Sequence, residues 1–222
     1  MKHFTLLTLA LALVAGAGAG GPFAGDPIPA TTQATGELKL GQTAPLFDHA
    51  MLGVDGDNHS IASEMGERGI LVVFSCNTCP FVVGNDEKSE GWEGRYMETA
   101  ARLREQGFGM ILVNSNEAKR GDVDSYKAMQ EHAEQRGYRI PYLVDENHEL
   151  ADAFGAMKTP HVYLLDASGT LVYRGAIDDN VNSAADVKER YVMSAVKDLV
   201  RGRPVSISET PAVGCSIKRV KA

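Results

Sequence analysis

The chain has 222 residues, with 22 lysine and arginine residues, 29 aspartate and glutamate residues and three cysteines. A content of 44% hydrophobic and 23% charged residues is typical of a globular protein and excludes general disorder and a disulfide-dense miniprotein. The net charge of −7 gives no broad basic surface for phosphate backbones, so we expect no nucleic-acid partner.

The N-terminal segment has the pattern of an export signal. Lys2 supplies a basic start, residues 4–14 are apolar apart from two threonines, and small residues fill positions 15–19. We therefore predict a signal peptide over residues 1–19, a flexible lead-in over 20–37, and an exported protein that is periplasmic or secreted. No later stretch reaches about 18 consecutive apolar residues, so we expect no stable membrane insertion.

The next elements alternate between strands and helices. Short apolar runs predict buried strands, and longer mixed segments predict helices. The predicted strands are 70–74, 108–113 and 141–144, and the predicted helices are 92–105, 122–136 and 149–154. Asp122 or Asp124 is the expected N-cap of the second helix, and Gly155 closes the third.

A predicted hairpin and a last helix complete the domain. Two β-rich runs, 161–165 and 170–174, flank a short glycine-containing loop, and residues 185–200 read as a helix. Helical crossovers followed by a hairpin predict an α/β fold with a mixed central sheet and helices on both faces. We expect the domain to span residues 38–203, and a polar tail over 204–222 to carry Cys215. Asp178 and Asp179 read as a solvated turn after the hairpin.

The chemistry is concentrated in the C-x-x-C motif Cys76-Asn77-Thr78-Cys79, which follows a predicted buried strand. If Cys76 begins a helix, unpaired backbone N–H groups favour its thiolate, so we expect Cys76 to attack and Cys79 to close the disulfide. Pro80 would clash with the Cys76 carbonyl in a regular helix, which implies a distorted first turn or a later start. Half of a zinc site and a static disulfide are the alternatives for this motif.

Thr159-Pro160 stands at the start of the predicted hairpin. A proline at the first position of a strand can simply mark an edge strand. Its order in the chain, far downstream of a C-x-x-C motif that follows a buried strand, is that of thioredoxin-like active sites.

Together these segments resemble the thioredoxin superfamily, within its redoxin or peroxiredoxin-like branch. The resemblance runs from about Gly41 to Lys218 and is carried by residues 41–47, 72–74, 76–82, 141–146, 155–160, 171–179 and 214–218. It implies a thioredoxin-like fold, a catalytic pair Cys76 and Cys79 that cycles between dithiol and disulfide, and Pro160 as a cis-proline. It also implies that Thr159 offers its backbone to a bound substrate chain.

The chain departs from the peroxiredoxin signature P-x-x-x-T-x-x-C. Counting back from Cys76, Val73 stands in place of the threonine and Gly69 in place of the proline. Efficient peroxide reduction is therefore not expected. The residues between the cysteines, Asn77-Thr78, also differ from the Gly-Pro of ordinary thioredoxins, so the direction of electron flow is not readable from the sequence.

Two further residues have open roles. Cys215 is a third redox thiol, a quiet structural thiol or a metal ligand. His161 either faces the active site, where it would lower a cysteine pKa or bind metal, or is turned away by strand alternation.

The leading hypothesis is an exported thiol–disulfide oxidoreductase that acts through a mixed disulfide at Cys76, with no cofactor and no resident metal. Its expected partners are protein or small-molecule thiols and disulfides and a further redox partner. The alternatives are a copper(I) metallochaperone that uses Cys76, Cys79 and either His161 or Cys215, a weak peroxiredoxin-like antioxidant protein, and a non-catalytic binding domain.

Overall fold

The fold is taken from a computed structural model that describes residues 1, 36–86 and 88–220. Apart from residue 1, the predicted signal peptide lies outside the described residues, as does the lead-in up to residue 35. Within the described part of the chain, no helix combines the length and the apolar character that crossing a membrane requires.

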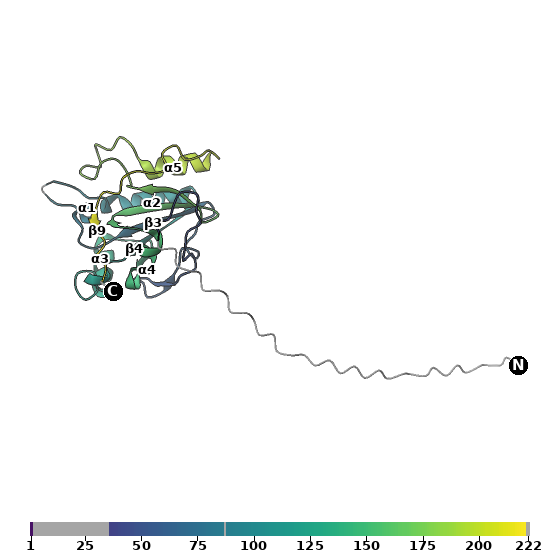
Figure 1. Cartoon of the computed structure of the whole chain (residues 1–222), viewed down its shortest axis with the longest axis horizontal. Coiled ribbons are helices and arrows are strands. Elements are labelled where there is room, and N and C mark those ends of the chain that lie inside the picture. Colours follow the sequence, from purple (N-terminus) through teal and green to yellow (C-terminus); the bar gives the residue numbers. More distant parts are fainter. Residues whose placement is uncertain (2–35, 87, 221–222) are drawn as a thin grey trace. The chain divides into compact units, whose positions relative to one another are not determined.

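A five-stranded mixed sheet organises the domain, in the spatial order β5-β4-β3-β7-β8 (Figure 1). Its strands are β3 (Gly69–Ser75), β4 (Phe108–Asn114), β5 (Tyr142–Val144), β7 (His161–Asp166) and β8 (Leu171–Gly175). β3 pairs in parallel with β4, and β4 with β5, whereas β7 is antiparallel to both β3 and β8. The predicted mixed sheet with a late hairpin is confirmed.

The helices lie between and after these strands. They are α1 (Pro80–Val83), α2 (Tyr96–Glu105), α3 (Tyr126–Arg136), α4 (Glu149–Phe154) and α5 (Tyr191–Val200), with single 3-10 turns η1 (Glu93–Arg95), η2 (Glu117–Lys119) and η3 (Glu146–His148). Two small antiparallel pairs join β1 (Met51–Leu52) to β2 (Asn58–His59), and β6 (Lys158–Thr159) to β9 (Cys215–Ser216).

The sheet separates two apolar clusters because successive side chains of a strand point to opposite faces. In β3, Leu71 and Val73 join the cluster that contains both cysteines of the C-x-x-C motif and the buried faces of α2, α3 and α5. Val72 and Phe74 join the cluster beneath α4. Figure 1 shows α2 and α5 on one side of the strands and α4 on the other. The expected helices on both faces are therefore present.

Three helices begin later than the sequence predicted. The α2 helix starts at Tyr96 rather than at 92, after the 3-10 turn η1. The α3 helix starts at Tyr126, and its N-cap is Ser125, whose side chain accepts a hydrogen bond from the N–H of Ala128. Asp122 and Asp124 are not its caps, because Asp124 is fully buried and its carboxylate is used elsewhere. The α5 helix starts at Tyr191 rather than at 185, after an irregular segment.

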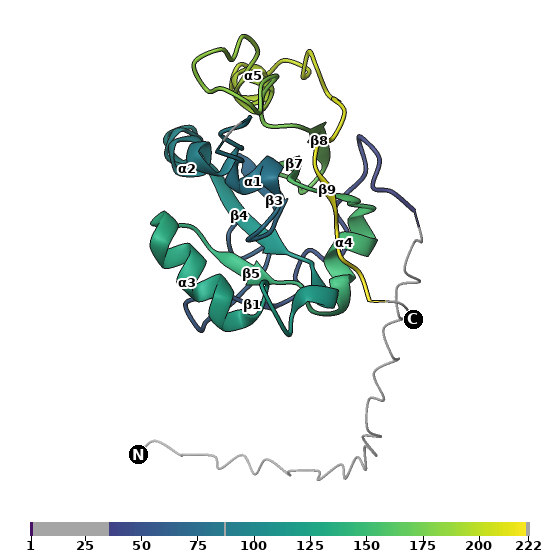
Figure 2. The same ribbon diagram turned by 90° about the vertical axis from the view of Figure 1, so that its left-hand side faces the viewer.

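The C-terminal segment returns to the middle of the domain. Figure 2 shows it, in yellow, passing α1 and then α4 before the chain ends. Its strand β9 pairs Cys215 with Thr159, and Ile217 is buried in the α4-side cluster. The polar tail that the sequence predicted is thus held against the core in this part.

Candidate active site

The two cysteines of the C-x-x-C motif are buried where β3 runs into α1. β3 ends at Ser75, and Cys76 and Cys79 have only 2% and 3% of their surfaces exposed. The helix begins at Pro80, so Cys79 and not Cys76 occupies its N-cap. This corrects the expectation that Cys76 starts the helix. The reason is Pro80, which is tolerated at the first helical position but would clash further inside.

Thr159 and Pro160 lie against both sulfurs. The peptide bond between them is cis, as the family resemblance implied. The Oγ1 atom of Thr159 lies 3.3 Å from the Cys76 sulfur, and the thiol of Cys79 donates to the Thr159 carbonyl oxygen across 3.0 Å. Residues 80 or more positions apart in the chain are therefore brought together at one end of the central sheet.

The electrostatics distinguish the two thiols. Donation of the Cys76 thiol to Cys79 keeps the proton on Cys76, and with burial it raises the pKa of Cys76. The same bond lowers the pKa of Cys79 to about 5, helped by hydrogen bonds from Cys215 and the Phe81 backbone. As a thiol Cys79 donates to Thr159, and as a thiolate it accepts from these donors. These shifts favour keeping the shared proton on Cys76 when one of the two thiols ionises.

Cys215 is the third member of the cluster. Its backbone N–H lies 3.4 Å from the Cys79 sulfur, and its thiol is within hydrogen-bond reach of the Cys79 thiol. Burial and the nearby Cys79 raise the pKa of Cys215 to about 11, against the opposing charges of Lys218 and Lys158. All three cysteines are free thiols in this structure.

Comparison with known families now assigns the chain. The Redoxin family model matches residues 24–189, which include the C-x-x-C motif and the cis-proline. The protein belongs to the Redoxin family. A comparison with curated proteins finds no match.

Several solved structures of other proteins have a fold similar to that of this Redoxin protein. An uncharacterised conserved protein from Geobacillus kaustophilus is 32% identical, with a TM-score of 0.73 and coverage of 83% of this chain and 94% of the other. A hypothetical protein from Sinorhizobium meliloti is 28% identical, with a TM-score of 0.73 and coverage of 84% and 98%. A thioredoxin-like protein in its oxidised form is 20% identical, with a TM-score of 0.55 and coverage of 75% and 99%. The Redoxin chain therefore has a thioredoxin-like fold.

A buried polar network holds the loop between the cysteines. The Asp124 carboxylate accepts hydrogen bonds from the Asn77 backbone at 3.0 Å, from the Asn114 amide at 2.8 Å and from the Asn116 amide at 2.9 Å. Tyr142 donates to the Asn77 side chain at 2.8 Å. This network was not predicted from the sequence. The signal for it was the polar run Asn114-Ser115-Asn116 directly after a buried strand.

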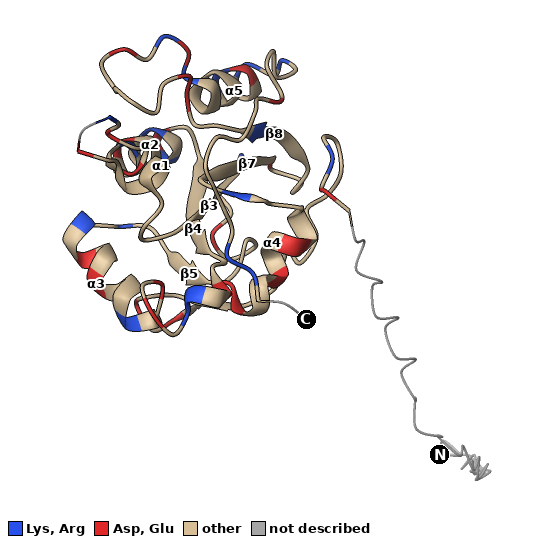
Figure 3. Cartoon of the chain, turned by 60° about the vertical axis from the view of Figure 1, so that its left-hand side comes forward, with Lys and Arg blue, Asp and Glu red and all other residues tan. Residues whose placement is uncertain are grey.

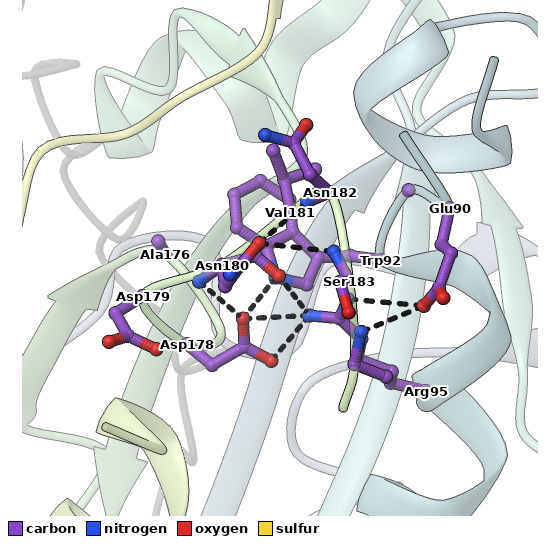
Figure 4. Close-up of polar contacts among 12 residues, drawn as sticks. Glu90, Trp92, Arg95, Ala176, Asp178, Asp179, Asn180, Val181, Asn182 and Ser183 are labelled. Carbon is purple, nitrogen blue, oxygen red and sulfur yellow. Dashed lines mark hydrogen bonds and ion pairs between the residues drawn. The ribbon is translucent and has the colours of Figure 1, made fainter. Parts of the chain in front are cut away.

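A second buried polar cluster of the Redoxin chain joins Trp92, Arg95 and Asp178 (Figure 4). Asp178 is 3% exposed, and its carboxylate accepts from the Trp92 indole at 2.8 Å and from the Arg95 guanidinium at 2.7 and 2.8 Å. Its placement in a solvated turn was therefore wrong, although the neighbouring Asp179 is exposed. The local sequence around Asp178 and Asp179 contains no sign that Asp178 pairs with Arg95, because Arg95 lies on a distant element.

This cluster borders an open pocket of about 410 Å³. Trp92, Asp178 and Tyr191 line one part of it, and Pro211 and Val213 line another. Val213 lies two residues before Cys215, so the pocket adjoins the segment that carries the third thiol.

His161 does not join the cysteines of the Redoxin site. It lies on β7 beside Tyr163, and its Nδ1 atom is 3.2 Å from the Tyr163 hydroxyl. The adjacent Val162 belongs to the cysteine-side cluster, so strand alternation turns His161 to the opposite face. Burial lowers the pKa of His161 to about 4. Across residues 36–86 and 88–220, no group of three or more histidine, cysteine or acidic residues is arranged to hold a metal ion.

Proposed function

We propose that this Redoxin protein is a thiol–disulfide oxidoreductase whose Cys76 and Cys79 cycle between dithiol and disulfide. The observation that carries the proposal is the pairing of two buried, unequal thiols: Cys76 donates to Cys79, which raises the pKa of Cys76 and lowers that of Cys79. Thr159, next to the cis-proline, contacts both sulfurs. Family membership supports redox chemistry, and the geometry supports the residues that carry it.

The chemistry follows from the unequal thiols. In the reductive direction the Cys79 thiolate attacks a partner disulfide, forms a Cys79–sulfur bond and releases one partner thiolate. Cys76 then loses its proton and attacks the Cys79 sulfur, which releases the second partner thiol and closes the Cys76–Cys79 disulfide. Two thiols of the protein are oxidised and one partner disulfide is reduced. This order exchanges the roles that the sequence analysis gave to the two cysteines.

The location and the partners belong to the same proposal. The signal-like residues 1–19 support export to a periplasmic or extracellular compartment, where thiol–disulfide chemistry on other proteins is common. Protein or small-molecule thiols and disulfides are the proposed partners.

Two measurements test the proposal: mass-spectrometric mapping of the disulfide and an assay of insulin reduction. The reduced protein is equilibrated with mixtures of reduced and oxidised glutathione, and mass spectrometry follows the Cys76–Cys79 disulfide. Insulin reduction by dithiothreitol is then measured for the wild type, Cys76→Ser and Cys79→Ser, with Thr78→Ser as a matched control, because Thr78 is exposed between the two cysteines. We expect a reversible disulfide, loss of catalysis in both cysteine variants and retention in the control. Absence of the disulfide, or full activity without either cysteine, would refute the proposal.

A further inference from the structure

The C-terminal segment occupies the position that the family resemblance assigns to a substrate chain. β9 pairs antiparallel with β6, so that Cys215 lies opposite Thr159, the residue before the cis-proline. The Cys215 N–H is directed at the Cys79 sulfur across 3.4 Å. A sulfur of the chain itself is therefore presented to the active pair in the manner of a bound partner.

The approach is close enough to require a glycine. A Cβ atom on Gly214 would lie 2.3 Å from the Thr159 carbonyl oxygen, far inside van der Waals contact. Gly214 therefore allows the backbone before Cys215 to lie directly against the strand that faces the active sulfurs.

Contacts beyond Cys215 fix the segment in this register. The backbone N–H of Ile217 donates to the Met157 carbonyl at 3.1 Å, and that of Lys218 donates to the Asn116 side chain at 2.8 Å. Asn116 also donates to Asp124, which holds the backbone of the loop between the cysteines. One hydrogen-bond network thus positions both the C-x-x-C loop and the segment that carries Cys215.

Accessibility differs among the three thiols. Cys76 and Cys79 are buried, whereas Cys215 is half-buried and Val213 is 40% exposed. Figure 3 shows basic residues on the C-terminal segment as it passes the strands. A partner in solution therefore meets Cys215 before it meets the buried pair.

We propose that Cys215 is a third catalytic thiol, which exchanges disulfides with Cys79 inside the protein and with the partner at the surface. This inference rests on the proposed dithiol–disulfide function. It differs from that mechanism in one step, because Cys215 rather than Cys79 forms the bond to the partner.

The exchange balances in each step. In the oxidised protein Cys215 attacks the Cys79 sulfur, the Cys76–Cys79 bond breaks, and the proton of Cys215 ends on Cys76. A substrate thiolate then attacks the Cys215 sulfur and releases Cys79 as a thiolate, which is a good leaving group because its pKa is about 5. A second substrate thiolate attacks the substrate sulfur bound to Cys215 and frees Cys215. Two substrate thiols become a disulfide, and the Cys76–Cys79 disulfide becomes two thiols. The reverse sequence reduces a substrate disulfide.

Disulfide trapping tests the internal step. Cys76→Ser leaves Cys79 and Cys215 as the only pair, and Cys79→Ser leaves Cys76 and Cys215 as the matched control. Each variant is titrated with oxidised glutathione, and the bonds are mapped by mass spectrometry. We expect an intramolecular Cys79–Cys215 disulfide in Cys76→Ser and little bonding in Cys79→Ser. Absence of the Cys79–Cys215 bond, or equal bonding in the two variants, would overturn the proposal.

Catalysis tests the external step. Cys215→Ser and Cys215→Ala are compared with the wild type in insulin reduction, after circular dichroism has shown that they are folded. We expect a loss of about tenfold or more in both variants, with the Cys76–Cys79 disulfide still forming against glutathione. A smaller loss, unchanged activity or a gain would show that the segment only covers the site. If Cys76–Cys79 fails to form even in the wild type, the proposed function fails first, so the two failures are distinguishable.

Discussion

The backbone N–H of Cys215 lies 3.4 Å from the sulfur of Cys79, although the two residues are 136 positions apart in the chain. The contact gives Cys79 a donor that ordinary burial would not supply, and it helps to stabilise the Cys79 thiolate. It also places the half-buried thiol of Cys215 beside Cys79. The position of the C-terminal segment and the pKa of Cys79 are therefore linked through Cys215.

The first prediction concerns the proton on the cysteine pair. Thiolate absorbance of the reduced wild type should titrate with a midpoint near pH 5, because the Cys76 thiol donates to Cys79 and lowers its pKa to about 5. Cys76→Ala removes that donor, so the midpoint should rise toward the ordinary value of 9.0. In Cys79→Ser the low midpoint should disappear. A low midpoint that survives in Cys79→Ser would assign the thiolate to another cysteine.

The second prediction concerns the close approach at Gly214. Gly214→Ala forces a Cβ against the Thr159 carbonyl and should displace β9 from β6, which exposes Cys79. We expect the alkylation rate of Cys79 by iodoacetamide to rise several-fold. Gly121→Ala is the matched control, because a Cβ at Gly121 meets no atom within 4 Å. Equal alkylation rates in the two variants would mean that the segment does not protect Cys79.

The third prediction concerns the buried counter-charge of Arg95. Asp178→Asn leaves the guanidinium without its carboxylate, and unfolding free energy should fall by about 3 kcal/mol or more, as for other broken buried ion pairs. Asp179→Asn is the control, because Asp179 is exposed, whereas the neighbouring Asp178 carboxylate binds the Arg95 guanidinium (Figure 4). Urea denaturation measures both variants. A similar loss in the two would show that the Asp178–Arg95 pair is not a main contributor.

The sequence predicted the central sheet, and it placed the C-x-x-C motif directly after a buried strand, because both features depend on local signals. The strand Gly69–Ser75 is a continuous buried apolar run, and the cysteines follow it directly. The pairing of Cys215 with Thr159 has no local signal, since it depends on where a distant segment returns. The burial of Asp178 was likewise missed, because its partners Trp92 and Arg95 lie more than 80 residues away.

The start of α1 shows how a correct local rule can be applied to the wrong residue. Pro80 indicated that a regular helix could not include Cys76, and the helix indeed begins at the proline. Cys79, the residue before the proline, therefore occupies the N-cap of α1. The motif alone identifies the pair, and the hydrogen bonds made by each sulfur distinguish the two members.

The last prediction concerns His161, which is buried on the opposite face of the sheet from the cysteines. Its pKa is lowered to about 4 from 6.5, chiefly by burial and also by the charge of Arg174. In the pH range between these values the unfolded chain binds a proton that the folded chain does not, so stability falls as the pH falls. Relative to His161→Gln, the wild type should lose about 2 kcal/mol of unfolding free energy between about pH 7 and about pH 4.5. Urea denaturation of both proteins at the two pH values measures this difference. Parallel losses in the two proteins would show that His161 is protonated without cost in the folded state, and would contradict its burial as a neutral ring against Tyr163.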